Sequence, residues 1–377
     1  MKFVVENVDD KYQRQRRKIL QQRKLDKHYE IDSNGNIPET LLNKVRISRM
    51  TEMDLYFYST EHSLGIINSY NEMLTFLYFK RVLKKMASTS PSDLPAIQAA
   101  LHNNCTRYKK YCDQQRPNYK MTSAHIQDCD VQFLNWCKSS NIKFDKSISI
   151  MDYQVTGKGL SCSADLSPDT TVIDLPRSMI ICTRTALESH IVYQQLKEAE
   201  VDDESLVTLF AMKEFCDPNS KWRGYFEAMP TSFETHPLFM SDNALDMLQG
   251  TLLFDEINNT KQSLKEFSSL MFPFIEQHFT QFFKGVLTIQ NLTYIRCVMD
   301  TRAFQIDELG FCLLPMIDMC NTNPYPQLET RGYYRAESDS VQLNNMYQTC
   351  AGEQLYICYG PYSSRVTFEW VWLRNRK

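Results

Sequence analysis

The chain has 377 residues, of which 43% are hydrophobic and 23% charged, and its formal net charge is −3. This composition is ordinary for a globular protein and gives no global attraction to nucleic acid or to an anionic membrane. The N-terminus has no long apolar segment, and no stretch approaches about 18 uncharged apolar residues, so we expect no signal peptide and no membrane-spanning helix.

The twelve cysteines are scattered without a C-x-x-C pair, and the seven histidines do not cluster with them. The spacing therefore does not favour a zinc site, and we expect no metal. Free thiols indicate an intracellular, reducing environment, so the expected location is the cytoplasm, the nucleus or both.

Residues 1–125 are predicted to form a helical N-terminal appendage, as a hairpin or small bundle. Eight lysines and arginines lie between Lys11 and Lys27. This run is typical of a solvated helical face, and a nuclear-localisation signal or a patch for an acidic partner is the alternative. Apolar residues then recur at helical spacing from 53 to 86, followed by a predicted helix over residues 94–113.

Residues 126–377 change in character and are predicted to form an α+β domain. Short strands bounded by Gly, Pro, Asp or Ser are predicted at 147–155, 159–163, 171–175 and 178–182. Residues 190–285 form a mainly helical insertion, with amphipathic runs at 205–215, 242–253 and 261–281. Strands return at 311–316, 333–336, 341–343 and 354–359.

Four segments carry residues suited to ligand binding, although each alone is common in proteins. Residues 156–160 read T-G-K-G-L between two predicted strands, and glycine lets the backbone approach a ligand closely because it lacks a Cβ. Arg302 ends a helical stretch and precedes Ala-Phe. Residues 313–324 read L-L-P-M-I-D-M-C-N-T-N-P, and residues 351–364 read A-G-E-Q-L-Y-I-C-Y-G-P-Y-S-S.

The order and spacing of these segments resemble the SET-domain protein methyltransferases, in the subclass of the Rubisco large-subunit and actin-histidine methyltransferases. G-K-G-L resembles the family's S-adenosylmethionine loop, and R-x-F, P-x-x-D-M-x-N and G-E-Q-L-x-I-x-Y-G follow in the family's order. In the insertion, residues 221–230 resemble the family's W-x-x-Y-x-x-x-L-P, and residues 248–251 its L-x-G-T. The resemblance covers about residues 130–372.

This resemblance implies an α+β SET fold, with short β-sheets and a C-terminal pseudoknot, split by the helical insertion. In the family, the segment around Asn321 and the segment after Tyr359 pass through one another. The two segments should therefore lie side by side although they are distant in the sequence.

The resemblance also implies S-adenosyl-L-methionine as the cofactor and a role for each matching residue. Tyr359 would be the catalytic tyrosine, its hydroxyl orienting the target nitrogen beside the cofactor. Asp318 would brace the cofactor-binding loop. Gly157, Lys158 and Gly159 would cradle the cofactor, and Arg302 would bind its carboxylate. Asn321 and Thr322 would bind its amino-acid and adenine parts. Phe304 and Tyr362 would line the substrate channel.

Some positions depart from the family's pattern. Thr322 stands where the family has histidine, Ser364 where it has asparagine, and residues 371–373 read V-W-L in place of Y-G-F. The family's helical C-terminal domain, which helps to hold the substrate, does not follow. We therefore expect a truncated or divergent member.

The expected function is methylation of lysine on a protein, histone or non-histone, by a monomer that binds neither nucleic acid nor membrane. A lysine amine must be neutral to attack, and an apolar, aromatic channel disfavours its ammonium form. The alternatives are a SET-fold scaffold with weak or no activity, and an interaction protein led by its helical N-terminal third.

Overall fold

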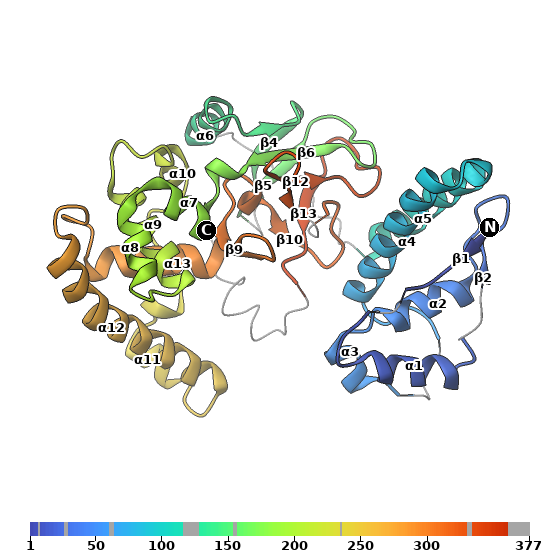
Figure 1. Cartoon of the computed structure of the whole chain (residues 1–377), viewed down its shortest axis with the longest axis horizontal. Helices are drawn as coiled ribbons and strands as arrows, with labels where there is room; N and C mark the ends of the chain where they lie inside the picture. Colours follow the sequence, from blue (N-terminus) through green and yellow to red (C-terminus); the bar gives the residue numbers. More distant parts are fainter. Residues whose placement is uncertain are drawn as a thin grey trace.

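The computed structural model describes residues 1–6, 8–25, 29–59, 64–115, 128–153, 157–233, 236–329 and 334–360. Helices dominate the first part of the chain, which lies to one side of the β-rich part (Figure 1). Its elements are β1 (Lys2–Phe3), α1 (Gln13–Gln22), β2 (Tyr29–Glu30), α2 (Glu39–Ser48), α3 (Glu52–Phe57), α4 (Ser69–Thr89), η1 (Pro91–Asp93) and α5 (Leu94–Gln115).

The long helices α4 and α5 pack against one another as a hairpin, joined by the single turn of η1. The prediction of one helical run from 53 to 86 is wrong, because α3 ends at Phe57 and α4 begins at Ser69. The new start is set by Asn68, whose side chain accepts a hydrogen bond from the backbone of Asn71. The two-residue strands β1 and β2 were not predicted.

The strands of the described residues form four small sheets. Their orders are β1-β2, β10-β13-β5-β4, β11-β12-β6-β3 and β7-β9-β8. The strands beyond β2 are β3 (Lys143–Phe144), β4 (Ile148–Tyr153), β5 (Gly157–Cys162), β6 (Thr171–Pro176), β7 (Ile181–Cys182), β8 (Phe304–Ile306), β9 (Gly310–Leu313), β10 (Asn321–Thr322), β11 (Tyr334–Arg335), β12 (Ser340–Asn344) and β13 (Gln354–Ile357).

Helices fill the chain between β7 and β8, and both of these strands pair with β9. The helices outside the N-terminal part are α6 (Asp128–Ser139), α7 (Thr183–Ser189), α8 (Ile191–Glu198), α9 (Asp203–Cys216), α10 (Arg223–Glu227), α11 (Asp242–Asp246), α12 (Leu252–Phe279) and α13 (Ile289–Arg302), with the short η2 (Arg177–Met179), η3 (Pro237–Phe239) and η4 (Ile317–Met319). None of the described helices is both long and apolar enough to cross a bilayer.

The predicted run over residues 242–253 is also interrupted. Gly250 has a φ of +79°, a left-handed conformation that glycine adopts without steric cost and that ends the preceding turn. Thr251 then caps α12 by accepting a hydrogen bond from the backbone of Phe254. A single continuous helix is therefore excluded by the backbone at this point.

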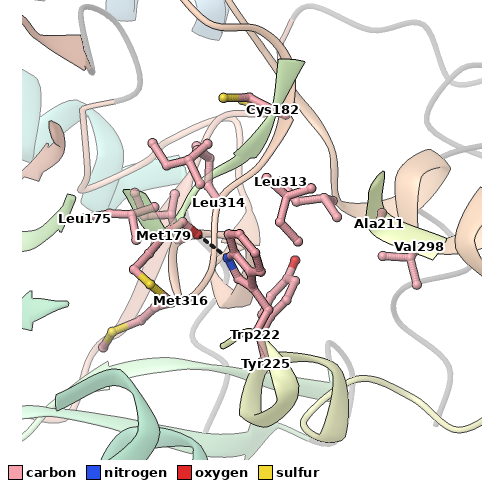
Figure 2. Packing of buried hydrophobic residues seen from close by; sticks show 14 of the residues in the cluster. Leu175, Met179, Cys182, Ala211, Trp222, Tyr225, Val298, Leu313, Leu314 and Met316 are labelled. Atoms are coloured by element: carbon pink, nitrogen blue, oxygen red, sulfur yellow. Dashed lines mark hydrogen bonds between the residues drawn. The ribbon is translucent and has the colours of Figure 1, made fainter. Parts of the chain in front are cut away.

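The main hydrophobic core joins the sheets to the insertion. Trp222 is almost fully buried, and its indole N–H donates to the carbonyl of Met179 at 2.8 Å (Figure 2). Around it pack side chains from strand β9 and helix α9, among them Leu313 and Ala211. A buried indole needs a partner for its N–H, so this bond fixes the insertion in register on the β-rich part.

A smaller apolar cluster connects the N-terminal helices to the β-rich part. Phe76 of α4 stacks on Tyr108 of α5, with ring centroids 4.4 Å apart, and Tyr108 contacts Tyr347 edge-on. Lys80 adds a hydrogen bond to the carbonyl of Met346. The N-terminal helices are therefore packed on the segment between β12 and β13.

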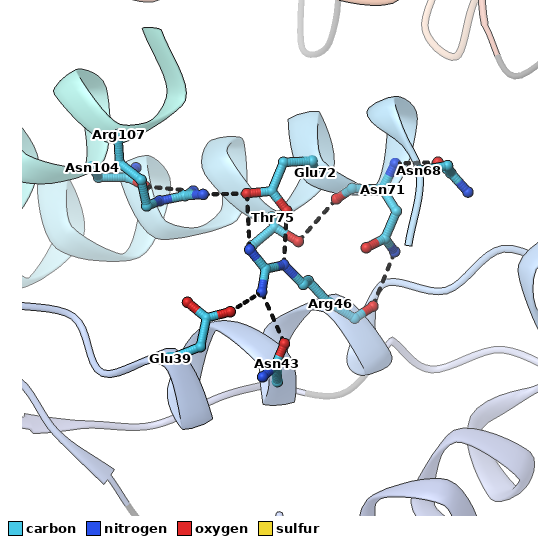
Figure 3. Close-up of polar contacts among 9 residues, drawn as sticks. All are labelled: Glu39, Asn43, Arg46, Asn68, Asn71, Glu72, Thr75, Asn104 and Arg107. Carbon is cyan, nitrogen blue, oxygen red and sulfur yellow. Dashed lines mark hydrogen bonds and ion pairs between the residues drawn. The ribbon is translucent and has the colours of Figure 1, made fainter. Parts of the chain in front are cut away.

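A buried ionic network fastens the N-terminal helices to one another (Figure 3). Arg46 of α2 donates through Nε to Glu72 of α4 at 2.8 Å, and Arg107 of α5 bonds the same carboxylate. Arg46 also bonds Glu39 and Asn43. Burial acts to raise the pKa of Glu72, but the two guanidinium groups hold that pKa below its ordinary value.

We expect Glu72→Gln to lower the free energy of unfolding by about 3 kcal/mol, because it leaves two guanidinium groups with a neutral partner. Since the pKa of Glu72 is depressed in the folded state, its stabilisation is present above the ordinary glutamate value of 4.5 and fades as the pH falls below it. Urea denaturation followed by circular dichroism at neutral and acidic pH measures both effects.

Glu198→Gln removes an exposed carboxylate of α8 and serves as the control, with a change below about 0.5 kcal/mol. A Glu72→Gln protein as stable as this control would show that the network contributes nothing.

Candidate active site

Three of the four segments that resemble SET-domain motifs meet in one sheet. Strand β10 pairs in parallel with β13, with Asn321 opposite Tyr356 and Thr322 opposite Ile357. Strand β13 pairs in turn with β5, the strand that contains G-K-G-L. The strand of Asn321 therefore lies beside the strand that leads into Tyr359, whereas the expected crossing with the segment after Tyr359 stays a prediction. Residues 361–377, which would complete a pseudoknot, lie outside the described residues.

The sequence predicts that the G-K-G-L segment begins as a loop between two strands. In the structure the whole segment belongs to strand β5. Gly157 pairs with Tyr153 at the end of the β4–β5 hairpin and has a φ of +65°, so glycine is suited to this turn. Lys158 follows it, and its ammonium lies 2.7 Å from a carboxylate oxygen of Asp130 on α6.

Gly159 lies where strands β5, β10 and β13 meet. A Cβ at this position would lie 2.4 Å from the amide nitrogen of Gln354 and 2.6 Å from that of Asn321. The amide of Asn321 donates to the carbonyl of Lys158 at 3.1 Å. The missing side chain of Gly159 therefore makes room for the two amides that join the three strands.

Tyr359 is held against the loop that leads into β10. Its hydroxyl donates to the carbonyl of Cys320 at 2.7 Å, and its backbone N–H donates to the hydroxyl of Thr322 at 3.2 Å. The ring is half-buried and packs on the main core. These two bonds fix the position and the direction of the tyrosine next to the Asn321–Thr322 strand.

Arg302 and Asp318, both predicted site residues, form a buried ion pair. Arg302 is the last residue of α13, and its guanidinium lies 3.1 Å from the Asp318 carboxylate. The hydroxyl of Tyr225 donates to the same carboxylate oxygen at 2.8 Å. Because the Asp318 side chain is fully buried, it braces the loop from inside and presents no exposed surface to a ligand.

The surroundings of this pair are apolar enough to shift neighbouring groups. Burial raises the pKa of Tyr294 to about 12, although the nearby Arg302 cation acts in the opposite direction. Burial, with a contribution from the Asp318 charge, also raises the pKa of the Cys137 thiol. Both groups therefore stay neutral at physiological pH.

The backbone is strained next to the brace. Met316 precedes η4 with a φ of +73° and a ψ of −42°, and its side chain is fully buried. A non-glycine residue in this region costs about 1–3 kcal/mol and persists only where the surroundings determine it. The contacts of Asp318, two residues later, supply such a constraint.

The structure describes one of the two predicted residues of the substrate channel, Phe304. Phe304 opens strand β8, where it pairs with Cys312, and it is partly buried against the main core. It follows Arg302 by two residues, so the ion pair of Arg302 also anchors the start of this strand. Tyr362 lies outside the described residues.

Three residues of the site were missed from the sequence. Asp130 pairs with Lys158 from a distant helix, and no sequence signal marks it. Gln354 contacts Gly159, and its position inside G-E-Q-L was noted only as part of the motif. Tyr225 was noted as the tyrosine of the W-x-x-Y pattern, and that pattern was the available signal for its bond to Asp318.

We expect Gly159→Ala to destabilise the protein by about 2 kcal/mol, because the added methyl group must displace two buried, hydrogen-bonded amides. Thermal unfolding measures the loss. Gly65→Ala is the matched control, since nothing lies within 4 Å of a Cβ there. Equal stability of the two variants would show that the strand junction relaxes without cost.

Comparisons with known proteins connect this geometry to a fold. No family model matches the chain. It is 24% identical over 250 residues to an actin-histidine N-methyltransferase of Xenopus tropicalis, covering 63% of this chain and 42% of that protein. It is 21% identical over 251 residues to SET domain-containing protein 4 of Homo sapiens, covering 63% and 56%. The chain thus spans about half the length of these curated relatives.

The solved structures that resemble it are SET domains. A structure of Rubisco LSMT bound to sinefungin and monomethyllysine matches with a TM-score of 0.56 and 21% identity, over 65% of this chain and 56% of that one. A structure of the LSMT SET domain bound to lysine and AdoHcy matches with a TM-score of 0.55 and 20% identity, over 64% and 56%. The chain therefore has the α+β SET fold and is similar to the SET-domain protein methyltransferases of the Rubisco and actin-histidine subclass.

Proposed function

We propose that the protein is an S-adenosylmethionine-dependent protein methyltransferase. The observation that carries the proposal is the position of Tyr359, whose hydroxyl is fixed on the Cys320 carbonyl beside the strands that contain Gly159 and Asn321. A tyrosine hydroxyl held in one direction next to a glycine-lined strand is suited to orienting a nucleophile toward a bound methyl donor.

The comparisons support this proposal. The relatives with similar sequences carry the name of a methyltransferase or of a SET-domain protein, and the similar structures contain AdoMet, AdoHcy or sinefungin. S-adenosylmethionine would supply an electrophilic methyl group on a sulfonium, and in-line transfer of such a group depends mainly on positioning.

The residues present fit this cofactor. Gly157 opens β5 without a side chain, and the amides of Asn321 and Gln354, which fill the space at Gly159, give the adjoining strands a polar junction. The two nearby cations already have carboxylate partners, Lys158 with Asp130 and Arg302 with Asp318. A cofactor carboxylate would therefore share these cations, which are held in place before it arrives.

The target that we propose first is a lysine side chain on a protein, histone or non-histone. Histidine is the second candidate, because several relatives with similar sequences are actin-histidine methyltransferases. Both targets are nitrogen nucleophiles that must lose a proton, and the site residues would orient either of them. A scaffold that keeps the SET fold without activity is the competing explanation.

We expect the protein to bind S-adenosylmethionine and S-adenosylhomocysteine with micromolar affinity by calorimetry. Tyr359→Phe should leave this affinity within about threefold and reduce methyl transfer to proteins of a cell lysate about 100-fold, since it removes one oriented hydroxyl. Tyr56→Phe, at an exposed tyrosine of α3, is the control and should change neither. A folded protein that binds neither ligand would leave the scaffold as the explanation.

Arg302→Lys is preferable to alanine in the same experiment. Alanine would leave the buried Asp318 carboxylate without its cation and could unfold the loop, whereas lysine keeps the charge and removes the planar fork. Weaker cofactor binding with unchanged thermal stability is the result expected for a residue that shares its charge with the cofactor.

The pH dependence of methyl transfer distinguishes the two targets. A lysine amine with an ordinary pKa of about 10.4 should give a rate that still rises above pH 8, whereas a histidine with a pKa of about 6.5 should give a plateau above about pH 7.5. Mass spectrometry of the labelled product identifies the methylated residue independently. A plateau together with methylhistidine would replace lysine as the proposed target.

A further inference from the structure

A cavity of about 650 Å³ lies between the N-terminal helices and the β-rich part. This volume is within the range of roughly 300–1,000 Å³ that is typical of ligand sites. Its wall combines the segment before α1, the α2–α3 junction and one face of α4 with Glu329 and Arg335 from the β-rich part. Its apolar lining includes Leu74, Leu77 and Tyr78.

The charged groups around this cavity are mainly cationic. Six cations line it, against three carboxylates. The cations are Arg16, Arg49, Lys80, Arg81, Lys84 and Arg335, and the carboxylates are Asp10, Glu52 and Glu329. The excess is local, because the whole chain carries a net charge of −3.

Three of the cations already have a carboxylate partner. Arg16 forms a two-pronged pair with Asp10, at 2.7 and 3.0 Å. Lys80 and Lys84 both bind Asp169, at 2.5 and 2.9 Å. These pairs hold the wall of the cavity together and leave their cations little capacity for a ligand.

The other three cations have no such compensation. In the described part of the chain, no carboxylate forms an ion pair with Arg49, Arg81 or Arg335. Arg49 lies over the ring of Tyr78, 4.0 Å from its centroid, and its Nη2 donates to the carbonyl of Glu6 at 2.6 Å. Among the described residues its buried Nε has no hydrogen-bond partner. Arg81 lies 5.7 Å from the same ring, and Arg335 is exposed on β11.

Burial of Arg49 without a carboxylate has an energetic cost. Burial lowers the pKa of Arg49, and the neighbouring Arg81 charge acts in the same direction, against the favourable effects of Tyr78 and of the Glu6 charge. An anion placed between these two guanidinium groups would reduce their repulsion and satisfy the free Nε.

We propose that this cavity binds an acidic segment of another protein. A peptide with carboxylate and apolar side chains matches both the uncompensated arginines and the apolar lining. A nucleic acid strand fits less well, because its backbone carries a charge at every nucleotide and has no aliphatic side chains for Leu74 and Leu77, whereas a peptide can combine a few carboxylates with apolar side chains. This binding surface is separate from the proposed methyl-transfer site and does not depend on activity there.

The test is fluorescence anisotropy of the full chain with a labelled hexaglutamate peptide, with hexaglutamine as the neutral probe. We expect saturable binding of hexaglutamate only, which weakens as salt is raised because the exposed charges are screened. Oligothymidylate of equal charge is the competitor. Tighter binding of the oligonucleotide than of the acidic peptide would overturn the proposal.

Variants locate the binding. Arg81→Gln and Arg335→Gln should each weaken it about threefold, and the double variant about tenfold, as expected for exposed charges. Both residues are exposed and make no ion pair in the described part of the chain, so folding should be unaffected. Glu329→Gln should tighten binding about threefold, because it removes a carboxylate from the wall.

Arg17→Gln is the matched control, since Arg17 is an exposed arginine of α1 outside the cavity. It should change the affinity by less than about twofold. If the double variant binds hexaglutamate as tightly as this control does, the acidic peptide does not occupy the cavity and the proposal fails.

Discussion

The buried carboxylate of Asp318 joins parts of the chain that are far apart in sequence. It accepts hydrogen bonds from Arg302 at the end of α13 and from Tyr225 in α10. Its backbone leads within two residues to Cys320, whose carbonyl holds the Tyr359 hydroxyl. A full desolvation cost is tolerable for this carboxylate only because both partners are present. The position of the tyrosine therefore depends on helices α10 and α13 through this carboxylate.

Much of the fold could be predicted from the sequence because its elements repeat local patterns. The β4, β5, β6 and β12 strands and the α5 and α9 helices lie close to their predicted ranges, since each has apolar periodicity and clear end signals. The errors fall where one backbone conformation decides the outcome, as at Gly250, or where a strand is too short to show periodicity, as in β8 and β10. A strand of two or three residues is defined by its hydrogen bonds to a distant strand, and the local sequence pattern does not show which segment that partner is.

The candidate site was predictable as a set of segments but not as a set of contacts. The resemblance placed the glycine segment, Asn321 and Tyr359 together, and the parallel pairing of β10 with β13 agrees. It did not show that Lys158 and Arg302 already have carboxylate partners. Partners such as Asp130 depend on how α6 packs in three dimensions. Their residue types are too common on protein surfaces to be recognised from the sequence.

The pairing of β5 with β13 also has a consequence for how the chain is made. Its partners are separated by more than half of the chain, so this contact has a high loop-closure cost and cannot form early. During synthesis, the N-terminal helices can pack as soon as α5 has been translated. The glycine strand must wait, with one edge unpaired, until β13 leaves the ribosome. An exposed edge during this interval leaves the nascent β4–β5 hairpin open to pairing with other chains.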